Sequence, residues 1–307
     1  MIKAIIRNTL RPLGLQLTSL PDHPVKGGRL QFGPYEIKTD NRELIRSYRD
    51  FPLTNSVIAR VVAAIAKDEP TLSMIDVGAN CGDSTAIAKT AHDLPVLCIE
   101  PDEHLYGQLQ DNLRQFSHIT LVRQYLGEQN AVGKFDVTKT GWNNTLVSPT
   151  DGATSVIDFK TLDETVRDWT YLNQVRFLKC DTEGFDVRVL HGARKLLTDR
   201  QPVVLFEYNR DSMTGCDEDG FRVFDYLRET GYGPVLFYDA YGRFIAAADL
   251  GSTELMRDFH DYAEGLKGKV LYYDVLAFAK KDAALAAGFI HAERTFRRGD
   301  GQPLNPQ

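Results

Sequence analysis

The chain has 307 residues and a formal net charge of −6 at pH 7, with 36 lysines and arginines against 42 aspartates and glutamates. This length suits one large α/β domain with additions, or two small domains. The acidic balance and the absence of a basic run argue against the phosphate backbone of nucleic acid as a partner. No apolar stretch approaches the roughly 20 residues of a membrane span, so no transmembrane segment is predicted.

The cysteines lie far apart and none shows CxxC spacing: Cys81, Cys98, Cys180 and Cys216. Cys98 and Cys180 fall inside stretches that are predicted to be buried strands. This pattern is typical of free thiols in a reducing compartment rather than of a disulfide framework. We therefore expect a cytoplasmic protein.

Residues 1–70 are predicted to form an accessory region of a helix, a short hairpin and a second helix. In residues 1–20, isoleucines and leucines gather on one side with basic residues between them. Such a helix could touch a membrane surface or pack on the domain, and it lacks the continuous apolar segment of a signal peptide. Residues 29–39 alternate around a Gly-Pro turn like a hairpin, and residues 56–67 have helical periodicity.

The segment at residues 74–102, MIDVGANCGDSTAIAKTAHDLPVLCIEPD, carries the most informative pattern. A short apolar strand leads into the tight loop GANCG at residues 78–82. Asp83 or Ser84 then offers an N-cap for the helix that follows. A second apolar strand ends at Glu100. Strand, glycine loop, helix, strand and acid in this order predict one nucleotide-binding half of a parallel sheet.

Glu100 lies about 20 residues beyond the glycine loop, where an acid can accept hydrogen bonds from ribose hydroxyls. Both a dinucleotide and S-adenosylmethionine use this arrangement. A dinucleotide loop needs glycine at its first, third and sixth positions, which here are Gly78, Asn80 and Asp83. A carboxylate is unfavourable where phosphate should sit, whereas Asp76 and Asp83 would stabilise the ammonium and sulfonium of S-adenosylmethionine. The pattern favours the methyl donor, with NAD or an unliganded glycine turn as alternatives.

Strand-like and helix-like patterns alternate along the rest of the chain. We expect helices at residues 103–116, 161–171 and 185–197 and a further helix through residue 228, and strands at residues 119–123, 175–180, 202–206, 235–247 and 270–279. This alternation predicts a doubly wound, mostly parallel α/β sheet, and the two late strands suit an antiparallel hairpin at its edge.

Short strands and turns between residues 127 and 160 predict a β insert in this domain. It contains Trp142, which either stacks on a sugar or packs beneath the insert. The domain itself is expected to span residues 71–290. A polar, loose tail is expected at residues 291–307.

Acids recur at the carboxyl ends of the predicted strands, where an open α/β sheet binds its ligands. Asp181 is the candidate general base for a hydroxyl acceptor, and Lys179, two residues earlier on the same face, would keep it ionised. Glu183 belongs either to the site or to the cap of the next helix. Asp181 and Glu207, together with Asn209, could instead bind Mg²⁺ through oxygen atoms.

Several of these stretches, in this order, resemble the FkbM-type S-adenosylmethionine-dependent methyltransferases. The resemblance is carried by IDVGANCGDST, IEPD, TLDE, FLKCDTEGFDVRVLHGA and VVLFEY, and more faintly by DVLAF, and it covers roughly residues 70–210. The chain departs from the family pattern at Cys81 and Cys180, where an aliphatic residue is usual, and at Asp186, where glutamate is more common.

The resemblance implies a class I methyltransferase fold, with a seven-stranded sheet that has one antiparallel strand. It also implies methyl transfer to a hydroxyl of a sugar, glycan or glycosylated natural product. The expected catalytic residues are Asp181, Lys179, Glu183 and Glu207. The expected cofactor-binding residues are Asp76, Gly78, Ala79, Asn80, Gly82, Asp83, Ser84, Glu100, Pro101 and Asp102.

Two other functions stay open at this point. One is a cofactor-binding domain without catalysis that acts in assembly, although the acids at Asp181, Glu183 and Glu207 favour an enzyme. The other is an NAD-dependent oxidoreductase, against which the missing glycine at Asn80 counts. The expected partner is a small-molecule or glycan acceptor.

Overall fold

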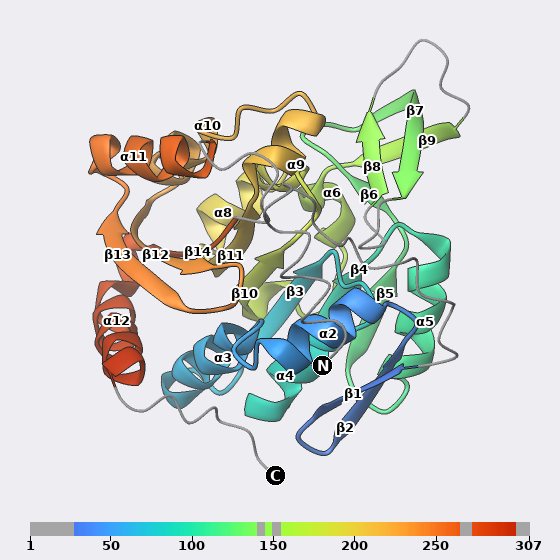
Figure 1. Ribbon diagram of the computed structural model, residues 1–307, viewed down its shortest axis with the longest axis horizontal. Coiled ribbons are helices and arrows are strands. Elements are labelled where there is room, and N and C mark those ends of the chain that lie inside the picture. Colours follow the sequence, from blue (N-terminus) through green and yellow to red (C-terminus); the bar gives the residue numbers. More distant parts are fainter. Residues whose placement is uncertain (1–27, 140–144, 149–154, 265–271, 299–307) are drawn as a thin grey trace, which may run out of the picture.

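The computed structural model describes residues 28–139, 145–148, 155–264 and 272–298. Within these residues the central sheet has eight strands in the order β13-β12-β14-β11-β10-β3-β4-β5 (Figure 1). They are β3 (Ser73–Val77), β4 (Val96–Ile99), β5 (Ile119–Val122), β10 (Val175–Cys180), β11 (Val203–Tyr208), β12 (Tyr232–Asp239), β13 (Phe244–Asp249) and β14 (Tyr273–Ala279).

The neighbouring strands from β11 to β5 run parallel to one another. Strand β14 lies between β11 and β12 and is antiparallel to both, and β13 is antiparallel to β12. The predicted mostly parallel α/β fold is confirmed. The predicted strand arrangement is corrected in part, because the described sheet has eight strands rather than seven and two of them are reversed, β13 at the edge and β14 in the interior.

One turn accounts for this correction. The stretch predicted as a single strand at residues 235–247 contains a turn in which Gly242 has a φ of 76° and donates its N–H to the carbonyl of Asp239 at 2.9 Å. The chain therefore folds back as the hairpin β12–β13. The last strand, β14, then pairs with β11 so that Asp274 lies opposite Glu207.

Helices cover both faces of the sheet, and each face has its own hydrophobic core (Figure 1). Alternation along β3 explains the division, since Met74 belongs to one core and Ile75 to the other. The first core is covered by α3 (Ser56–Asp68), α4 (Asp83–Ala91), α5 (Glu103–Leu113) and α12 (Ala283–Arg298). The second is covered by α6 (Leu162–Val166), α7 (Asp186–His191), α8 (Arg194–Asp199), α10 (Arg222–Glu229) and α11 (Thr253–Glu264).

The N-terminal region contains the predicted hairpin, β1 (Gly28–Phe32) and β2 (Tyr35–Thr39), and the predicted helix α3. It also contains a helix that the sequence analysis missed, α2 (Arg42–Asp50), whose N-cap Asn41 accepts from two backbone N–H groups. This helix is short and has few apolar residues, although they lie on one side of it. The segment at residues 1–20 lies outside the described residues.

Several predicted helix boundaries are corrected. The helix expected at residues 185–197 is two helices, α7 and α8, because the chain bends at Gly192, where a Cβ would lie only 2.2 Å from the carbonyl oxygen of Gly127. The helix expected at residues 161–171 ends at Val166 and is followed by the 3₁₀ turn η2 (Leu172–Gln174). Helices α9 (Arg210–Gly215) and α11 were not predicted.

The C-terminal tail is also corrected over part of its length. Helix α12, preceded by the 3₁₀ turn η3 (Lys280–Asp282), continues to Arg298 instead of ending in a loose segment. Glu293 in α12 is 1% exposed and binds Arg60 of α3 through two hydrogen bonds of 2.6 and 3.0 Å. This buried ion pair fastens the helix to the domain.

The expected β insert is a small sheet beside the main one, drawn at the upper right of Figure 1. Its strand order is β6-β9-β7-β8, with β6 (Tyr125–Leu126), β7 (Ala131–Lys139), β8 (Thr145–Ser148) and β9 (Ser155–Lys160). Trp142 lies outside the described residues. Among the described helices, none combines the length and apolar character that crossing a membrane requires.

Candidate active site

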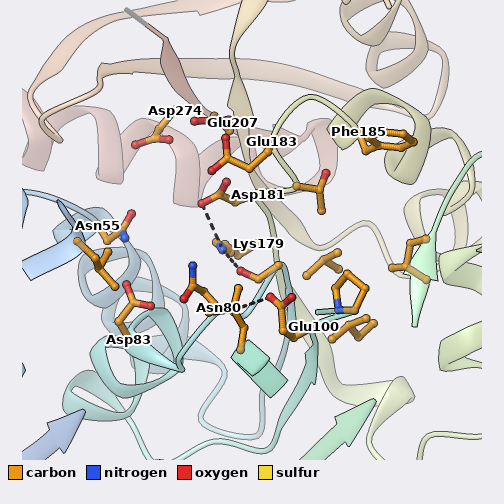
Figure 2. Close-up of a pocket in the computed structure, with 18 of the residues that line it drawn as sticks. Asn55, Asn80, Asp83, Glu100, Lys179, Asp181, Glu183, Phe185, Glu207 and Asp274 are labelled. Atoms are coloured by element: carbon orange, nitrogen blue, oxygen red, sulfur yellow. Dashed lines mark hydrogen bonds and ion pairs between the residues drawn. The ribbon is translucent and has the colours of Figure 1, made fainter. Parts of the chain in front are cut away.

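A cavity opens at the carboxyl ends of β3, β4, β10 and β11, the edge at which ligands were expected. Figure 2 shows that acids from several elements point toward it, with Lys179 in their midst. Of the predicted site residues, the structure brings together at this cavity Gly78, Asn80, Asp83, Glu100, Pro101, Lys179, Asp181, Glu183 and Glu207.

The glycine loop is tight because three of its residues adopt left-handed backbone conformations: Gly78 with φ 72°, Asn80 with φ 49° and Gly82 with φ 94°. A Cβ on Gly78 would lie 1.8 Å from the carbonyl oxygen of Asp181, so only glycine allows the tips of β3 and β10 to meet. The predicted N-cap is corrected, because Gly82 precedes helix α4 and Asp83 is already its first residue.

Glu100 lies at the end of β4 and is buried beside the loop. Its carboxylate accepts the backbone N–H of Asn80 at 2.9 Å and that of Asp102 at 2.9 Å. Burial raises the pKa of Glu100 to about 7, although these hydrogen bonds act in the opposite direction. Each of its oxygens has one such donor, which leaves further acceptor positions that face the cavity.

Lys179 is the buried cation at the centre of the site. Its ammonium donates to the carbonyl of Gly78 at 2.8 Å and lies 3.5 Å from the carboxylate of Asp181 and 3.6 Å from that of Asp76. Burial alone would lower the pKa of Lys179, but the charges of Asp181, Asp76 and Asp83 outweigh it and raise the pKa well above normal. The predicted pairing of Lys179 with Asp181 is thus present.

Asp76 lies deeper than expected. Its side chain is 0% exposed, and it accepts the hydroxyls of Ser84 at 2.6 Å and Thr85 at 2.8 Å instead of lining the cavity. Its carboxylate therefore joins strand β3 to helix α4 and neutralises Lys179. The expected direct contact of Asp76 with a ligand is corrected to this supporting position.

Asp83 does line the cavity, but its carboxylate already accepts a hydrogen bond from a side chain of α2. The hydroxyl of Tyr48 in α2 donates to Asp83 at 2.5 Å, and the amide of Asn55 donates to the Tyr48 oxygen at 2.9 Å. Burial raises the pKa of Asp83, against the effect of the Tyr48 hydroxyl. These contacts place α2 and the turn before α3 against the glycine loop.

Four other predicted residues do not line the cavity: Ala79, Gly82, Ser84 and Asp102. Asp102 is the N-cap of α5 and accepts from the N–H groups of His104 and Leu105. Ala79 donates its N–H to the carbonyl of Ile99 at 3.1 Å. These residues shape the loop and the start of α5.

Glu183 points into the cavity and is not a helix cap. Its φ of 54° is left-handed, and it is followed by Gly184 with φ 99°. The N-cap of α7 is Phe185, and the carboxylate of Asp186, the first residue of the helix, accepts the N–H groups of Thr182 and Gly184 in the preceding turn. Burial raises the pKa of Glu183 to about 8, and the charges of Asp181 and Asp186 add to the rise.

Glu207 and Asp274 complete the acidic side of the cavity (Figure 2). Burial raises the pKa of Glu207 well above normal and that of Asp274 to about 8, and neighbouring acids strengthen both shifts. Asp274 was missed as a site residue, although the DVLAF stretch that begins with it carried a faint family signal.

Of the three expected oxygen ligands for a metal, only Asp181 and Glu207 line the cavity. Asn209 accepts the N–H of Ser212 as the N-cap of α9 and does not line the cavity. Among the described residues, no group of three or more histidine, cysteine, aspartate and glutamate side chains has a geometry that could hold a metal ion.

Residues of the N-terminal accessory region form another wall of the cavity. They are Asn41, Leu44, Ser47, Thr54 and Asn55, from α2 and its flanking turns. Sequence reasoning missed them because α2 itself was not predicted. The N-cap signal at Asn41 was the available clue.

Comparisons with known proteins were made for the whole chain. No curated protein matched it. An FkbM methyltransferase structure from Methylobacillus flagellatus is 24% identical, with a TM-score of 0.39, over 54% of this chain but only 40% of that one. A precorrin-6y C5,15-methyltransferase from Geobacter metallireducens is 13% identical, with a TM-score of 0.39, over 72% of this chain and 87% of that one. An S-adenosylmethionine-dependent methyltransferase from Agrobacterium tumefaciens is 10% identical, with a TM-score of 0.41, over 84% and 72%.

The model of the methyltransferase FkbM domain matches residues 76–234, just over half of the 307 residues. The match begins at Asp76 in β3 and ends within β12. It therefore contains the glycine loop, Glu100, the Lys179–Asp181 pair and Glu207, whereas α2 and Asp274 lie outside it. The chain belongs to the FkbM family of S-adenosylmethionine-dependent methyltransferases.

Proposed function

We propose that the protein transfers the methyl group of S-adenosylmethionine to a hydroxyl of a sugar, glycan or glycosylated natural product. The observation that carries this proposal is the shared cavity, which Glu100 lines on one side and the Lys179–Asp181 pair on another. One side can hold a ribose and the other can take a proton, which are the two tasks of this reaction.

The residues of the cavity fit the cofactor. Glu100 has free acceptor positions for ribose hydroxyls, and such donors would favour its charged form over the neutral one. The side-chain oxygen of Asn80 is buried without a hydrogen-bond partner and could accept from the ammonium of the cofactor. Gly78, Asp83 and Pro101 would complete the wall, while Asp76, Ala79, Gly82, Ser84 and Asp102 would hold the loop in shape.

Asp181 is the proposed general base. Its side chain is 39% exposed toward the cavity, and Lys179 fixes its orientation from 3.5 Å. The bound cofactor supplies an activated methyl group on sulfur. Asp181 would take the hydroxyl proton as the acceptor oxygen bonds to the methyl carbon and the carbon–sulfur bond breaks. Glu183 and Glu207 would hold the acceptor beside this pair.

The cofactor assignment is tested by calorimetry with S-adenosylhomocysteine and with NAD. We expect saturable binding of S-adenosylhomocysteine and none of NAD, because Asn80 and Asp83 replace glycine and a phosphate position. Binding of NAD without a response to S-adenosylhomocysteine would refute the proposed function in favour of an oxidoreductase.

The role of Asp181 is tested with Asp181→Asn, which is nearly isosteric. Turnover measured with radiolabelled methyl donor and a panel of sugars should fall roughly a hundredfold, with unchanged affinity for S-adenosylhomocysteine. Asp111→Asn, at an exposed position on α5, is the matched control. Full turnover of Asp181→Asn would contradict the role of Asp181 as the base. If a chelator abolishes the activity of the wild-type protein and Mg²⁺ restores it, Asp181 is a metal ligand instead.

We also propose a cytoplasmic location. The thiols Cys81, Cys98, Cys180 and Cys216 are all free and buried, which suits a reducing compartment.

A further inference from the structure

Three carboxylates converge at one end of the cavity, and we call this group the acid pocket: Glu183, Glu207 and Asp274. They come from the turn before α7, from β11 and from β14 (Figure 2). Glu207 and Asp274 are directly opposed in the antiparallel pair β11–β14. Like charges in opposed positions destabilise a sheet. Placing these acids together therefore lowers the stability of the fold when they are ionised.

One atom of the acid pocket lacks a partner. Glu207 is 6% exposed, and its Oε2 atom is buried with no hydrogen-bond partner. An unsatisfied buried acceptor costs about 1–3 kcal/mol, and more when it is charged. Glu207 lines the cavity, so a donor that enters the cavity can satisfy it.

Cationic side chains of the described residues do not pair directly with the acid pocket. Within the described part of the chain, no lysine, arginine or histidine forms an ion pair with Glu183, Glu207 or Asp274. Lys179 is engaged by Asp181, Asp76 and the carbonyl of Gly78. When these acids ionise, their negative charge therefore faces the cavity without a partner ion among the described residues.

The backbone at Glu183 supports the same conclusion. A residue with a side chain rarely adopts its φ of 54°, and such strain persists where the surrounding structure holds it for a function. Here the next residue must be glycine, because a Cβ on Gly184 would lie 2.5 Å from the backbone of Ser212. The turn directs Glu183 into the cavity, and the carboxylate of Asp186 stabilises this turn by accepting the N–H groups of Thr182 and Gly184.

These observations point to a cationic group with several hydrogen-bond donors. A divalent metal needs three or more ligands at short, defined distances, and the described residues do not supply such a group. An ammonium carries three donors and one charge and tolerates separated acceptors. We propose that the acid pocket binds the protonated amine of the methyl acceptor, so that the acceptor is an amino-bearing hydroxyl compound such as an amino sugar.

This inference rests on the proposed function, because it assumes that the cofactor binds on the side of the cavity opposite the acid pocket. The cofactor also carries an ammonium, which is the second possible source of the same chemistry. Asn80, with its unpartnered oxygen, belongs to the glycine loop and offers that group a separate acceptor. The acid pocket is therefore assigned to the acceptor, and the experiment distinguishes the two sources.

The experiment uses trans-4-aminocyclohexanol and its neutral analogue trans-1,4-cyclohexanediol as probes. Each is titrated by calorimetry into full-length protein saturated with S-adenosylhomocysteine. We expect the amine to bind at least tenfold more tightly than the diol, because the charge is the main difference between them. Equal binding of the two probes would overturn the inference.

Binding should also tighten as the pH rises from about 6.5 to 9. The amine stays protonated in this range, while the acid pocket must release protons to accept it, since burial raises the pKa of Glu183 and Asp274 to about 8. The charged and titratable groups around the pocket are Asp181, Asp186, Asp239, Lys179 and Tyr272. Proton release, measured in buffers of different ionisation enthalpy, should accompany the binding of the amine. An affinity that is independent of pH would count against the acid pocket as the site.

Two variants locate the site. Glu207→Gln and Asp274→Asn should each reduce the preference for the amine to within about twofold, and Glu103→Gln, an exposed glutamate on α5, should leave it unchanged. Both pocket variants remove a strained charge, so neither should lose the fold. An unchanged preference in both variants would overturn the assignment.

Further outcomes separate the alternatives. Amine binding to the free protein that S-adenosylhomocysteine abolishes would assign the acid pocket to the cofactor and overturn the inference. Saturable Mg²⁺ binding that displaces the amine would overturn it in favour of a metal. Failure to bind S-adenosylhomocysteine would refute the proposed function alone, because the preference of the free protein for the amine would still support a cation site.

Discussion

A single buried cation organises the charges at the carboxyl ends of the central strands. Lys179 donates to the carbonyl of Gly78 and lies within 3.6 Å of both Asp181 and Asp76, so it connects the tips of β10 and β3. An acid on each side keeps the ammonium charged, and the ammonium in turn orients Asp181 toward the cavity. One residue thus links the glycine loop to the proposed base.

Glu100 makes the sharpest prediction at the scale of single residues. Glu100→Ala removes the acceptor of two backbone N–H groups and of the proposed ribose hydroxyls. Affinity for S-adenosylhomocysteine should fall by about 1–3 kcal/mol, roughly ten- to a hundredfold, measured by calorimetry. Glu100→Asp should have a smaller effect, and Glu103→Ala, which is exposed nearby on α5, should have none. Unchanged affinity in both Glu100 variants would move the ribose position elsewhere.

At the scale of elements, the site depends on how closely two strand tips approach. The left-handed Gly78 brings the loop after β3 against the carbonyl of Asp181, where no side chain fits. The turn between β10 and α7 is equally constrained, with Glu183 and Gly184 both at positive φ. These turns set where Asp181 and Glu183 point.

Two glycine substitutions test this view. Gly78→Ala should destabilise the protein by more than the roughly 1–3 kcal/mol of a strained backbone, because its Cβ also meets the Asp181 carbonyl. Gly107→Ala, in the exposed interior of α5 with nothing within 4 Å, should stabilise it by about 0.5–1 kcal/mol. Chemical denaturation measures both. Equal effects of the two substitutions would show that the loop tolerates a side chain.

The C-terminal helix α12 offers a second test at this scale. Glu293→Ala leaves Arg60 buried without its partner, which should cost about 3–5 kcal/mol in the free energy of unfolding. Glu36→Ala breaks an exposed ion pair with Arg29 and should cost less than about 1 kcal/mol. If the two losses measured by chemical denaturation are similar, the Arg60–Glu293 pair is not buried in solution.

For the whole molecule, the main electrostatic feature is that three acids with raised pKa values gather on one side of one cavity. Burial and mutual repulsion raise the pKa of Glu183, Glu207 and Asp274 together. The sheet topology causes this, because β10, β11 and β14 are neighbours and each brings an acid to the same edge. Stability and ligand binding are therefore both coupled to pH.

The pH dependence follows from the direction of these shifts. Between the unfolded pKa values near 4 and the folded values near 8, the folded protein binds more protons than the unfolded chain. The contribution of these acids to the free energy of unfolding of the ligand-free protein should therefore be largest below about pH 4 and fall as the pH rises to 8. Denaturation at several pH values measures this slope, and Glu207→Gln should flatten it. Stability that rises across this range would contradict the burial of these acids.

Local patterns in the chain were sufficient to predict much of the fold and part of the site. Strand β10 has the predicted bounds, and the glycine loop and Glu100 lie where their spacing indicated. These features depend on residues close together in the chain, whose periodicity and turn chemistry reflect local backbone preferences. The boundaries of the accessory region, the domain and the tail stay a prediction.

Only the tertiary structure decided how distant segments meet. It placed β14 between β11 and β12 and brought Asp274 opposite Glu207, because pairing across the sheet depends on register and not on local pattern. In the tertiary structure Asp76 is buried away from the cavity and Asn55 lines it, since burial follows from packing between elements. The sequence by itself determined the family, the glycine loop and the strand-end acids, whereas the three-dimensional packing decided which of those acids face one another.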